Sequence, residues 1–259
     1  MRLERVERRV LGAVRFLDAT TRLPVRSPLS VAGDGVRLVR NLQGLYVLQE
    51  APGLATHTEA FLAPPPHPAL GGLRVELAVS DPGGRYLPRA LALQLPRDPD
   101  PDHAEMEDSL FRPVDALLYP APAASVAPGW AVVRATVVRA GTGEPLAGAL
   151  LRVLRKADGE VLARALCEWR DAVRGEALVA VAGVPVTTWG DGAPDEPVLV
   201  NELPVTLEAF FDPAFDPASG RAPDPDRMEL LRLGLPSAQA DLKLASGRTE
   251  KQILTLAVP

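Results

Sequence analysis

Apolar and polar residues alternate along most of this 259-residue chain, in short runs separated by turns rich in Gly, Pro and Asp. The cleanest run covers residues 73–80, where Leu73, Val75, Leu77 and Val79 alternate with polar or small residues. A period of two places those four side chains on one face of a strand. The pattern therefore predicts strands with one buried face.

The same signal recurs in both halves of the chain. Strands are expected at residues 10–19, 36–39, 45–49, 73–80, 90–95, 132–139, 149–155, 161–167, 177–181, 186–189, 198–211, 242–244 and 252–258. One short helix is expected at 227–233, because proline recurs too often elsewhere to allow others. These elements predict an all-β fold class.

One phrase occurs twice, as an alternating strand followed by a short turn that ends in proline. The first copy is Gly12-Ala-Val-Arg-Phe-Leu-Asp-Ala-Thr-Thr-Arg-Leu-Pro-Val25, and the second runs from Trp130 to Leu146. Repetition of this kind predicts two immunoglobulin-like or transthyretin-like β-sandwich domains joined by a Pro-rich strap. The expected boundaries are 1–96, 97–128 and 129–259.

The segment between the expected domains is acidic and rich in proline. Residues 97–108 carry too little apolar surface to order themselves and predict a loop. Residues 110–119 are more apolar and predict an edge strand or strap, with Phe111, Leu118 and Tyr119 as candidate interface residues. We expect residues 97–122 and the charged arm 1–9 to become ordered when a partner binds.

Charge and hydropathy narrow the function. A net charge of −5 disfavours nucleic acid, which is bound mainly through Lys and Arg. No run approaches the ~20 apolar residues of a membrane span, and the charged N-terminus lacks the apolar core of a secretory signal. The sequence therefore predicts a cytoplasmic location. A larger particle that is released from the cell is able to carry such a protein.

No pattern of catalytic residues is visible. The single cysteine, Cys167, excludes an internal disulfide, and His57, His67 and His103 lie in separate loops without metal-ligand spacing. Nucleophile elbows and phosphate-binding glycine loops are absent from the sequence. We predict no enzyme activity, cofactor or metal, although the carboxylates of residues 98–108 and 212–226 leave calcium binding open.

Tryptophan offers the best single interface anchor. Trp189 precedes Gly190-Asp-Gly192, at an expected transition from strand to loop. Tryptophan is enriched among the residues that dominate binding energy, so Trp189 joins the candidate interface residues. An exposed Trp189 beside carboxylates would also suit the alternative function, a carbohydrate-type ligand-binding module.

The turn Gly141-Thr-Gly-Glu-Pro-Leu-Ala-Gly148, followed by the alternating run from 149 to 155 and an Asp158-Gly159 turn, resembles the carboxypeptidase regulatory-like and transthyretin-like β-sandwich families. The resemblance covers residues 130–189 and implies a fold more than an activity. Residues 170–174 depart from the Asp-x-x-Gly that is usual in these families.

The whole layout, two β domains with the strap 110–122 between them, resembles accessory proteins of phage-tail-like contractile injection systems. In those systems such proteins occur at the cap end or as adaptors. The resemblance implies a structural protein present in multiple copies, which docks onto protein subunits of a larger assembly. Strand addition at an exposed sheet edge is the expected mechanism.

Overall fold

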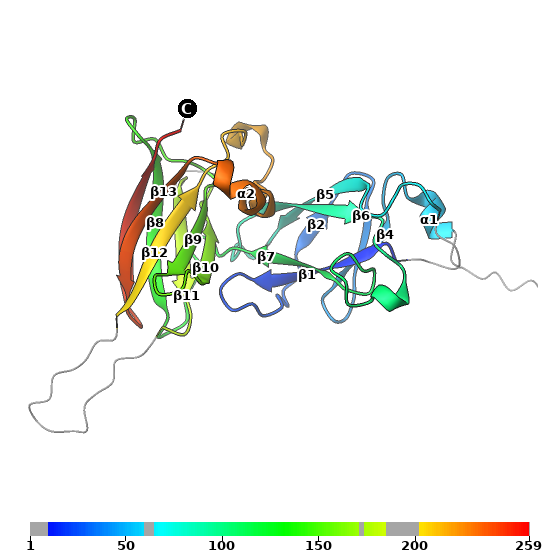
Figure 1. The fold of residues 1–259 in the computed structure, drawn as a ribbon, viewed down its shortest axis with the longest axis horizontal. Coiled ribbons are helices and arrows are strands. Elements are labelled where there is room, and N and C mark those ends of the chain that lie inside the picture. The colour runs from blue at the N-terminus through cyan, green and yellow to red at the C-terminus, as the bar shows by residue number, and fades with distance from the viewer. Residues whose placement is uncertain (1–9, 60–64, 171–173, 185–201, 259) are drawn as a thin grey trace, which may run out of the picture. The chain divides into compact units, whose positions relative to one another are not determined.

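The computed structural model describes residues 10–59, 65–170, 174–184 and 202–258 (Figure 1). Strands supply most of the regular structure, and the described helices are short, so the predicted all-β class is confirmed. The two α-helices are α1 (Ala55–Glu59) and α2 (Pro225–Leu231). The expected strand at 186–189 and the arm 1–9 lie outside the described residues.

The chain packs as two compact units. The N-terminal unit comprises Met1–Leu17, Leu23–Pro82 and Pro88–Leu117, and the C-terminal unit comprises Asp18–Arg22, Gly83–Leu87 and Leu118–Pro259. Two short turns from the first part of the sequence, at 18–22 and 83–87, thus belong to the C-terminal unit.

The N-terminal unit contains two sheets. One has the order β3-β4-β1-β7 and the other β2-β5-β6. The strands are β1 (Gly12–Asp18), β2 (Ser30–Ala32), β3 (Arg37–Arg40), β4 (Tyr46–Glu50), β5 (Leu73–Ser80), β6 (Arg89–Leu95) and β7 (Val114–Leu118). On β5 the predicted alternation is confirmed, because Val75, Leu77 and Val79 are buried between exposed neighbours.

The C-terminal unit also contains two sheets, ordered β10-β9-β12-β13 and β11-β8-β14. Its strands are β8 (Ala131–Arg139), β9 (Leu150–Arg155), β10 (Val161–Leu166), β11 (Glu176–Val181), β12 (Leu203–Phe210), β13 (Ser237–Leu244) and β14 (Thr249–Leu256). One continuous core takes side chains from both sheets, among them Val133 and Val179 from one and Val153 and Leu207 from the other. The two sheets therefore enclose a single hydrophobic layer.

The repeated sequence phrase has the same local structure in both places. Leu17 forms a bridge with Pro24 after β1, and Val138 forms a bridge with Pro145 after β8. The first turn contains one residue with positive φ, Arg22 (φ 60), and the second contains two, Gly141 (φ 83) and Gly143 (φ 72). Because glycine tolerates this conformation and arginine does not, the first copy is the more strained of the two.

The apolar strap was expected to form an edge strand, and it does. Residues 114–118 form β7, which lies at the end of the sheet β3-β4-β1-β7, next to β1.

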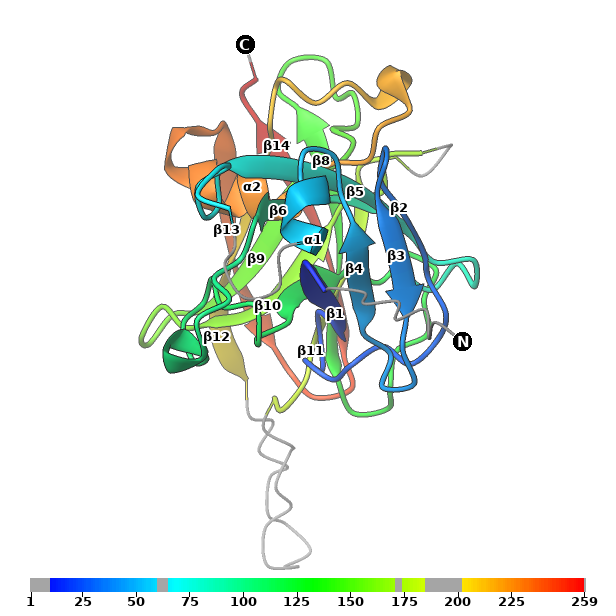
Figure 2. The same ribbon diagram turned by 90° about the vertical axis from the view of Figure 1, so that its right-hand side faces the viewer.

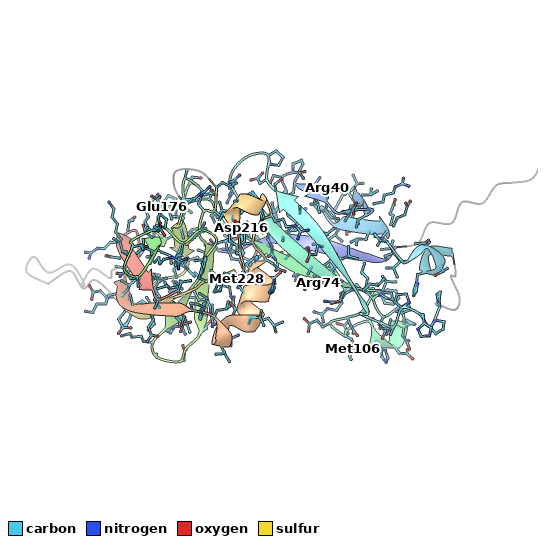
Figure 3. The ribbon with its side chains drawn as sticks, turned by 90° about the horizontal axis from the view of Figure 1, so that it is seen from above. Arg40, Arg74, Met106, Glu176, Asp216 and Met228 are labelled. Atoms are coloured by element: carbon cyan, nitrogen blue, oxygen red, sulfur yellow. The ribbon has the colours of Figure 1, made fainter. Side chains whose placement is uncertain are left out.

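The acidic loop of residues 97–112 differs from expectation, because it is ordered without a partner. The Arg97 guanidinium donates hydrogen bonds to the carbonyl oxygens of Ser109 (2.9 Å) and Glu107 (2.5 Å), and Arg112 donates to that of Glu105 (2.6 Å). Hydrogen bonds between arginine side chains and backbone therefore supply the order that apolar burial does not. Met106, labelled in Figure 3, is 56% exposed at the surface of this loop.

Two groups of this loop shift each other's pKa in opposite directions. Nδ1 of His103 lies 2.6 Å from Oδ2 of Asp98. This hydrogen bond raises the pKa of His103 above its ordinary 6.5, and the backbone N–H of Asp100 together with His103 lowers the pKa of Asp98 below 3.8. The stabilisation by charged His103 is complete below pH 6.5 and is lost as the pH rises through the raised pKa. The stabilisation by charged Asp98 is complete above pH 3.8 and is lost as the pH falls through the lowered pKa.

We expect His103 to titrate with a midpoint above 6.5 in the wild-type protein and at a lower pH in Asp98→Asn, because the amide carries no charge. The measurement is an NMR titration of the His103 ring protons. An unchanged midpoint in Asp98→Asn would show that the contact does not perturb His103.

Candidate protein-binding surface

Helix α2 is defined by strong local signals at its start. The Asp224 side chain caps the helix by accepting a hydrogen bond from the Arg227 backbone N–H (3.1 Å), and Pro225 occupies the first turn. The chain continues as a 3₁₀ turn at Arg232–Gly234 and then enters β13. The helix contacts β9, and Met228, labelled in Figure 3, is only 2% exposed. Figure 2 shows α2, in orange, on the same side of the C-terminal unit as β13.

The side of α2 that faces the sheet carries a charge. Glu229 lies with Oε1 3.4 Å from Nη1 of Arg152 on β9 and with Oε2 3.5 Å from Nε of Arg164 on β10. The two arginines are direct cross-strand partners, and the Arg152 side chain is only 10% exposed. Because Leu151 and Val153 point into the core, the alternation of β9 leaves Arg152 on the outer face, where it meets the helix.

The C-terminal end of the same segment exposes leucines to solvent. Leu230 is 81% exposed, Leu231 44% and Leu233 93%. We call these three residues the leucine ridge. Part of α2 follows the usual arrangement of a surface helix, since Met228 is buried and Asp226 and Arg227 are exposed, but Glu229 faces the sheet while these leucines face solvent.

Exposure of the leucine ridge to water is energetically unfavourable, and a partner that covers it removes this cost. Full burial of one leucine side chain is worth about 1.5–3 kcal/mol relative to leaving it in water. Single exposed leucines are normal, but a contiguous group marks a site of interaction. Arg152 and Arg164, on the outer face of β9 and β10, hold Glu229 toward the sheet.

A second feature of the C-terminal unit is the edge of β13. Among the described residues, β12 is the strand that pairs with β13, and β13 ends the sheet β10-β9-β12-β13. Near the start of β13 the surface is hollowed, and the hollow is lined by Glu208, Phe210, Ser237, Ala238 and Gln239. The leucine ridge, the hollow and the free edge therefore follow one another along the sequence from 230 to 244.

The predicted interface residues fall in different environments. Phe111 is 56% exposed, whereas Leu118 and Tyr119 are only 1% and 2% exposed. The backbone carbonyl oxygens of Leu118 and Tyr119 accept hydrogen bonds from the N–H groups of Ala19 and Leu87, both 2.8–2.9 Å long. The side chains of Leu118 and Tyr119 contribute to the core, and Trp189 lies outside the described residues.

Carboxylates in the acidic loops hold turns. Asp212 and Asp216 each accept a hydrogen bond at 2.9 Å from the backbone N–H two residues later, and Asp224 caps α2. Within the described ranges, no group of three or more His, Cys, Asp or Glu residues is placed to hold a metal ion. Burial raises the pKa of the Cys167 thiol far above its ordinary value, which keeps the thiol protonated and unreactive.

A second hollow lies beside the connection between β8 and β9 and is lined in part by Arg139, Arg174 and Phe215. Trp169 packs edge-on against Phe215 with ring centroids 6.2 Å apart, and only 8% of Trp169 is exposed. A platform for sugar stacking needs an exposed aromatic face, and Trp169 does not offer one.

Comparison with known proteins does not assign the chain to a family. No protein-family model matches the chain, and no curated protein matches it. None of the helices in the described part of the chain is long and apolar enough to cross a membrane.

Sequence reasoning identified the segment of the leucine ridge but not its role. A short helix at 227–233 was expected, and α2 with the following 3₁₀ turn confirms it. The signal that was missed is the pair Arg152 and Arg164, which alternation places on the outer face of the sheet beneath the helix.

Proposed function

We propose that this protein is a non-enzymatic structural adaptor that docks onto other protein subunits through the leucine ridge of its C-terminal unit. The observation that carries the proposal is the exposure of Leu230 and Leu233 to solvent while Glu229 of the same segment faces the sheet. The partner surface that fits is an apolar groove, because three leucines on one turn present a convex hydrophobic edge.

The assembly we propose is the cap end of a phage-tail-like contractile injection particle. The layout of two β units and an intervening strap supports this, since it resembles accessory proteins of those systems. In this proposal the protein works in several copies and acts without a cofactor. The ordered loop 97–112 and the exposed Phe111 of the N-terminal unit are then available to a further subunit.

We further propose that both units are immunoglobulin-like or transthyretin-like sandwiches and that the C-terminal one is related to the carboxypeptidase regulatory-like family. The turn between β8 and β9 supports the relation, because its Gly141-Thr-Gly-Glu-Pro sequence lies between two consecutive strands, which belong to different sheets. The matching turn after β1 supports a common origin of the two units.

The test compares the wild-type protein with Leu230→Asp/Leu233→Asp, each tagged and purified from the native host in mild salt. Both side chains are largely in water, so the substitutions leave the fold intact and place two charges in the proposed contact. We expect the variant to lose the co-purifying subunits at least tenfold, as measured by mass spectrometry. Sheath, tube or other tail-like subunits among them would support the cap proposal.

A matched control is Leu42→Asp, because Leu42 is fully exposed in the turn between β3 and β4 of the N-terminal unit. This variant makes the same chemical change away from the ridge and should retain every companion. If the ridge variant keeps the same companions as Leu42→Asp, the leucine ridge is not the docking surface.

A further inference from the structure

The hydrogen-bonding direction of β13 follows from its neighbour. The backbone N–H of Lys156 donates to the carbonyl of Pro204 (3.1 Å), so Pro204 and every second residue of β12 direct their backbone groups toward β9. Val205, Leu207 and Ala209 therefore bond to their partners Leu242, Ala240 and Ala238 on β13. The N–H and C=O groups of Ser237, Gln239, Asp241 and Lys243 consequently point to the free edge.

The side chains along this edge alternate in charge. Asp241 and Lys243 project from the outer face with side chains 66% and 68% exposed. Within the chain Asp241 pairs with Lys156 (2.5 Å) and Lys243 pairs with Glu202 (2.8 Å). Charged side chains on an edge strand ordinarily discourage pairing with a second strand. The edge of β13 carries one charge of each sign, so a second copy in the right register meets opposite charges.

We propose that the free edge of β13 pairs with the β13 edge of a second copy of this chain, antiparallel and about a two-fold axis. In this arrangement Asp241 of each copy lies opposite Lys243 of the other, and Leu242 lies opposite Leu242 on the axis. Two opposite-charge cross-strand pairs form at once, because a two-fold interface repeats every contact. The paired sheets become one continuous sheet across the dimer.

Charge selects this register over its neighbours. If the two-fold axis moves by one residue along β13, Asp241 lies opposite Asp241 or Lys243 lies opposite Lys243, depending on the direction of the move. Like charges directly opposite each other destabilise a strand pair. The inner face of β13 also becomes more buried, since Ala240 and Leu242 are only half-buried and pack at the open side of the core. A neighbouring strand covers them.

The first test uses charge reversal and the mass of the particle in solution. The wild-type protein is expected to have twice the 27.6 kDa of the chain by sedimentation equilibrium or light scattering. Asp241→Lys and Lys243→Asp each place like charges opposite each other in both pairs, and about tenfold weaker self-association is expected from each. An equimolar mixture of the two variants restores opposite charges in both pairs and should dimerise like the wild type.

The second test fixes the register by cysteine cross-linking. Cys167 is buried and its thiol stays protonated, so it contributes no background. Leu242→Cys places two thiols opposite each other on the axis at a position that makes no hydrogen bonds across the new pair, where strands approach to about 4.5–5.5 Å. Mild oxidation should give a disulfide dimer from Leu242→Cys and none from Ala240→Cys.

The outcomes separate this inference from the proposed adaptor function. A dimer that forms equally in all charge variants, or that cross-links through Ala240→Cys alone, overturns the proposed pairing. A monomeric wild-type protein also overturns it, even if the leucine ridge still binds other subunits. Leu230→Asp/Leu233→Asp should remain dimeric, because the ridge lies outside the paired residues.

Discussion

Glu229→Met is expected to lower the free energy of unfolding by about 2–3 kcal/mol. The substitution removes the carboxylate that faces Arg152 and Arg164 and leaves both arginines beneath α2. Most of this loss comes from leaving the charge of Arg152 unpaired, since only 10% of its side chain is exposed to solvent. Its register partner Glu208 on β12 offsets part of the lost charge, which keeps the expected loss below that of a fully orphaned ion.

Urea unfolding followed by tryptophan fluorescence measures this change, because Trp130 and Trp169 belong to the C-terminal unit. The control is Arg152→Met/Glu229→Met. The ion contacts are longer than hydrogen bonds, and Nε of Arg152 has no hydrogen-bond partner among the described groups. Removing both ions should therefore recover most of the stability. If Glu229→Met alone unfolds like the wild type, the cluster does not hold α2.

Gly175→Ala is expected to cost about 3 kcal/mol, from about 1–2 kcal/mol of left-handed backbone strain and a further steric cost. Gly175 has φ +78, and an added Cβ would lie 2.8 Å from the carbonyl oxygen of Val137 and 2.9 Å from Cβ of Pro145. The backbone of Gly175 cannot move away, because its N–H donates to Glu168 and its carbonyl accepts from Val137 (both 2.9 Å).

Gly183→Ala is the matched control, since Gly183 has φ +76 and an added Cβ would meet nothing within 4 Å. It carries the strain without the clash, so about 1–2 kcal/mol is expected. The difference between the two variants in urea unfolding isolates the close approach of Gly175 to the β8–β9 turn. Equal losses in both variants would mean that the turn yields to the extra methyl group.

Alternation located the strands well where one face is buried. The expected run 73–80 matches β5 at both ends, and the expected run 177–181 lies within β11. The strand β13 was harder, because only 242–244 was expected and the strand begins at Ser237. Ala238 and Ala240 are too small to give a strong apolar signal, and an edge strand needs little burial from them.

The candidate surface was beyond the reach of local patterns. The sequence predicts the α2 segment as a helix, but a helical repeat alone places leucines inward. The inward orientation of Glu229 involves Arg152 and Arg164, which are distant in sequence and meet Glu229 only after β9 and β10 pair. Likewise the order of loop 97–112 comes from two arginines that bond to backbone carbonyls, an interaction without a sequence motif.

The parallel pairing of β8 with β14 has a consequence for biosynthesis. Ser246, just before β14, donates a hydrogen bond to the carbonyl of Gly129, just before β8, and 117 positions separate the two residues. When β8 emerges from the ribosome, one of its edges stays unpaired until β14 is translated, and β14 is the last strand of this unit. Long-range pairing of this kind is slow, since the connecting chain must close a large loop first. A nascent chain arrested before residue 249 therefore exposes β8, and chaperone binding is expected to be strongest at that stage.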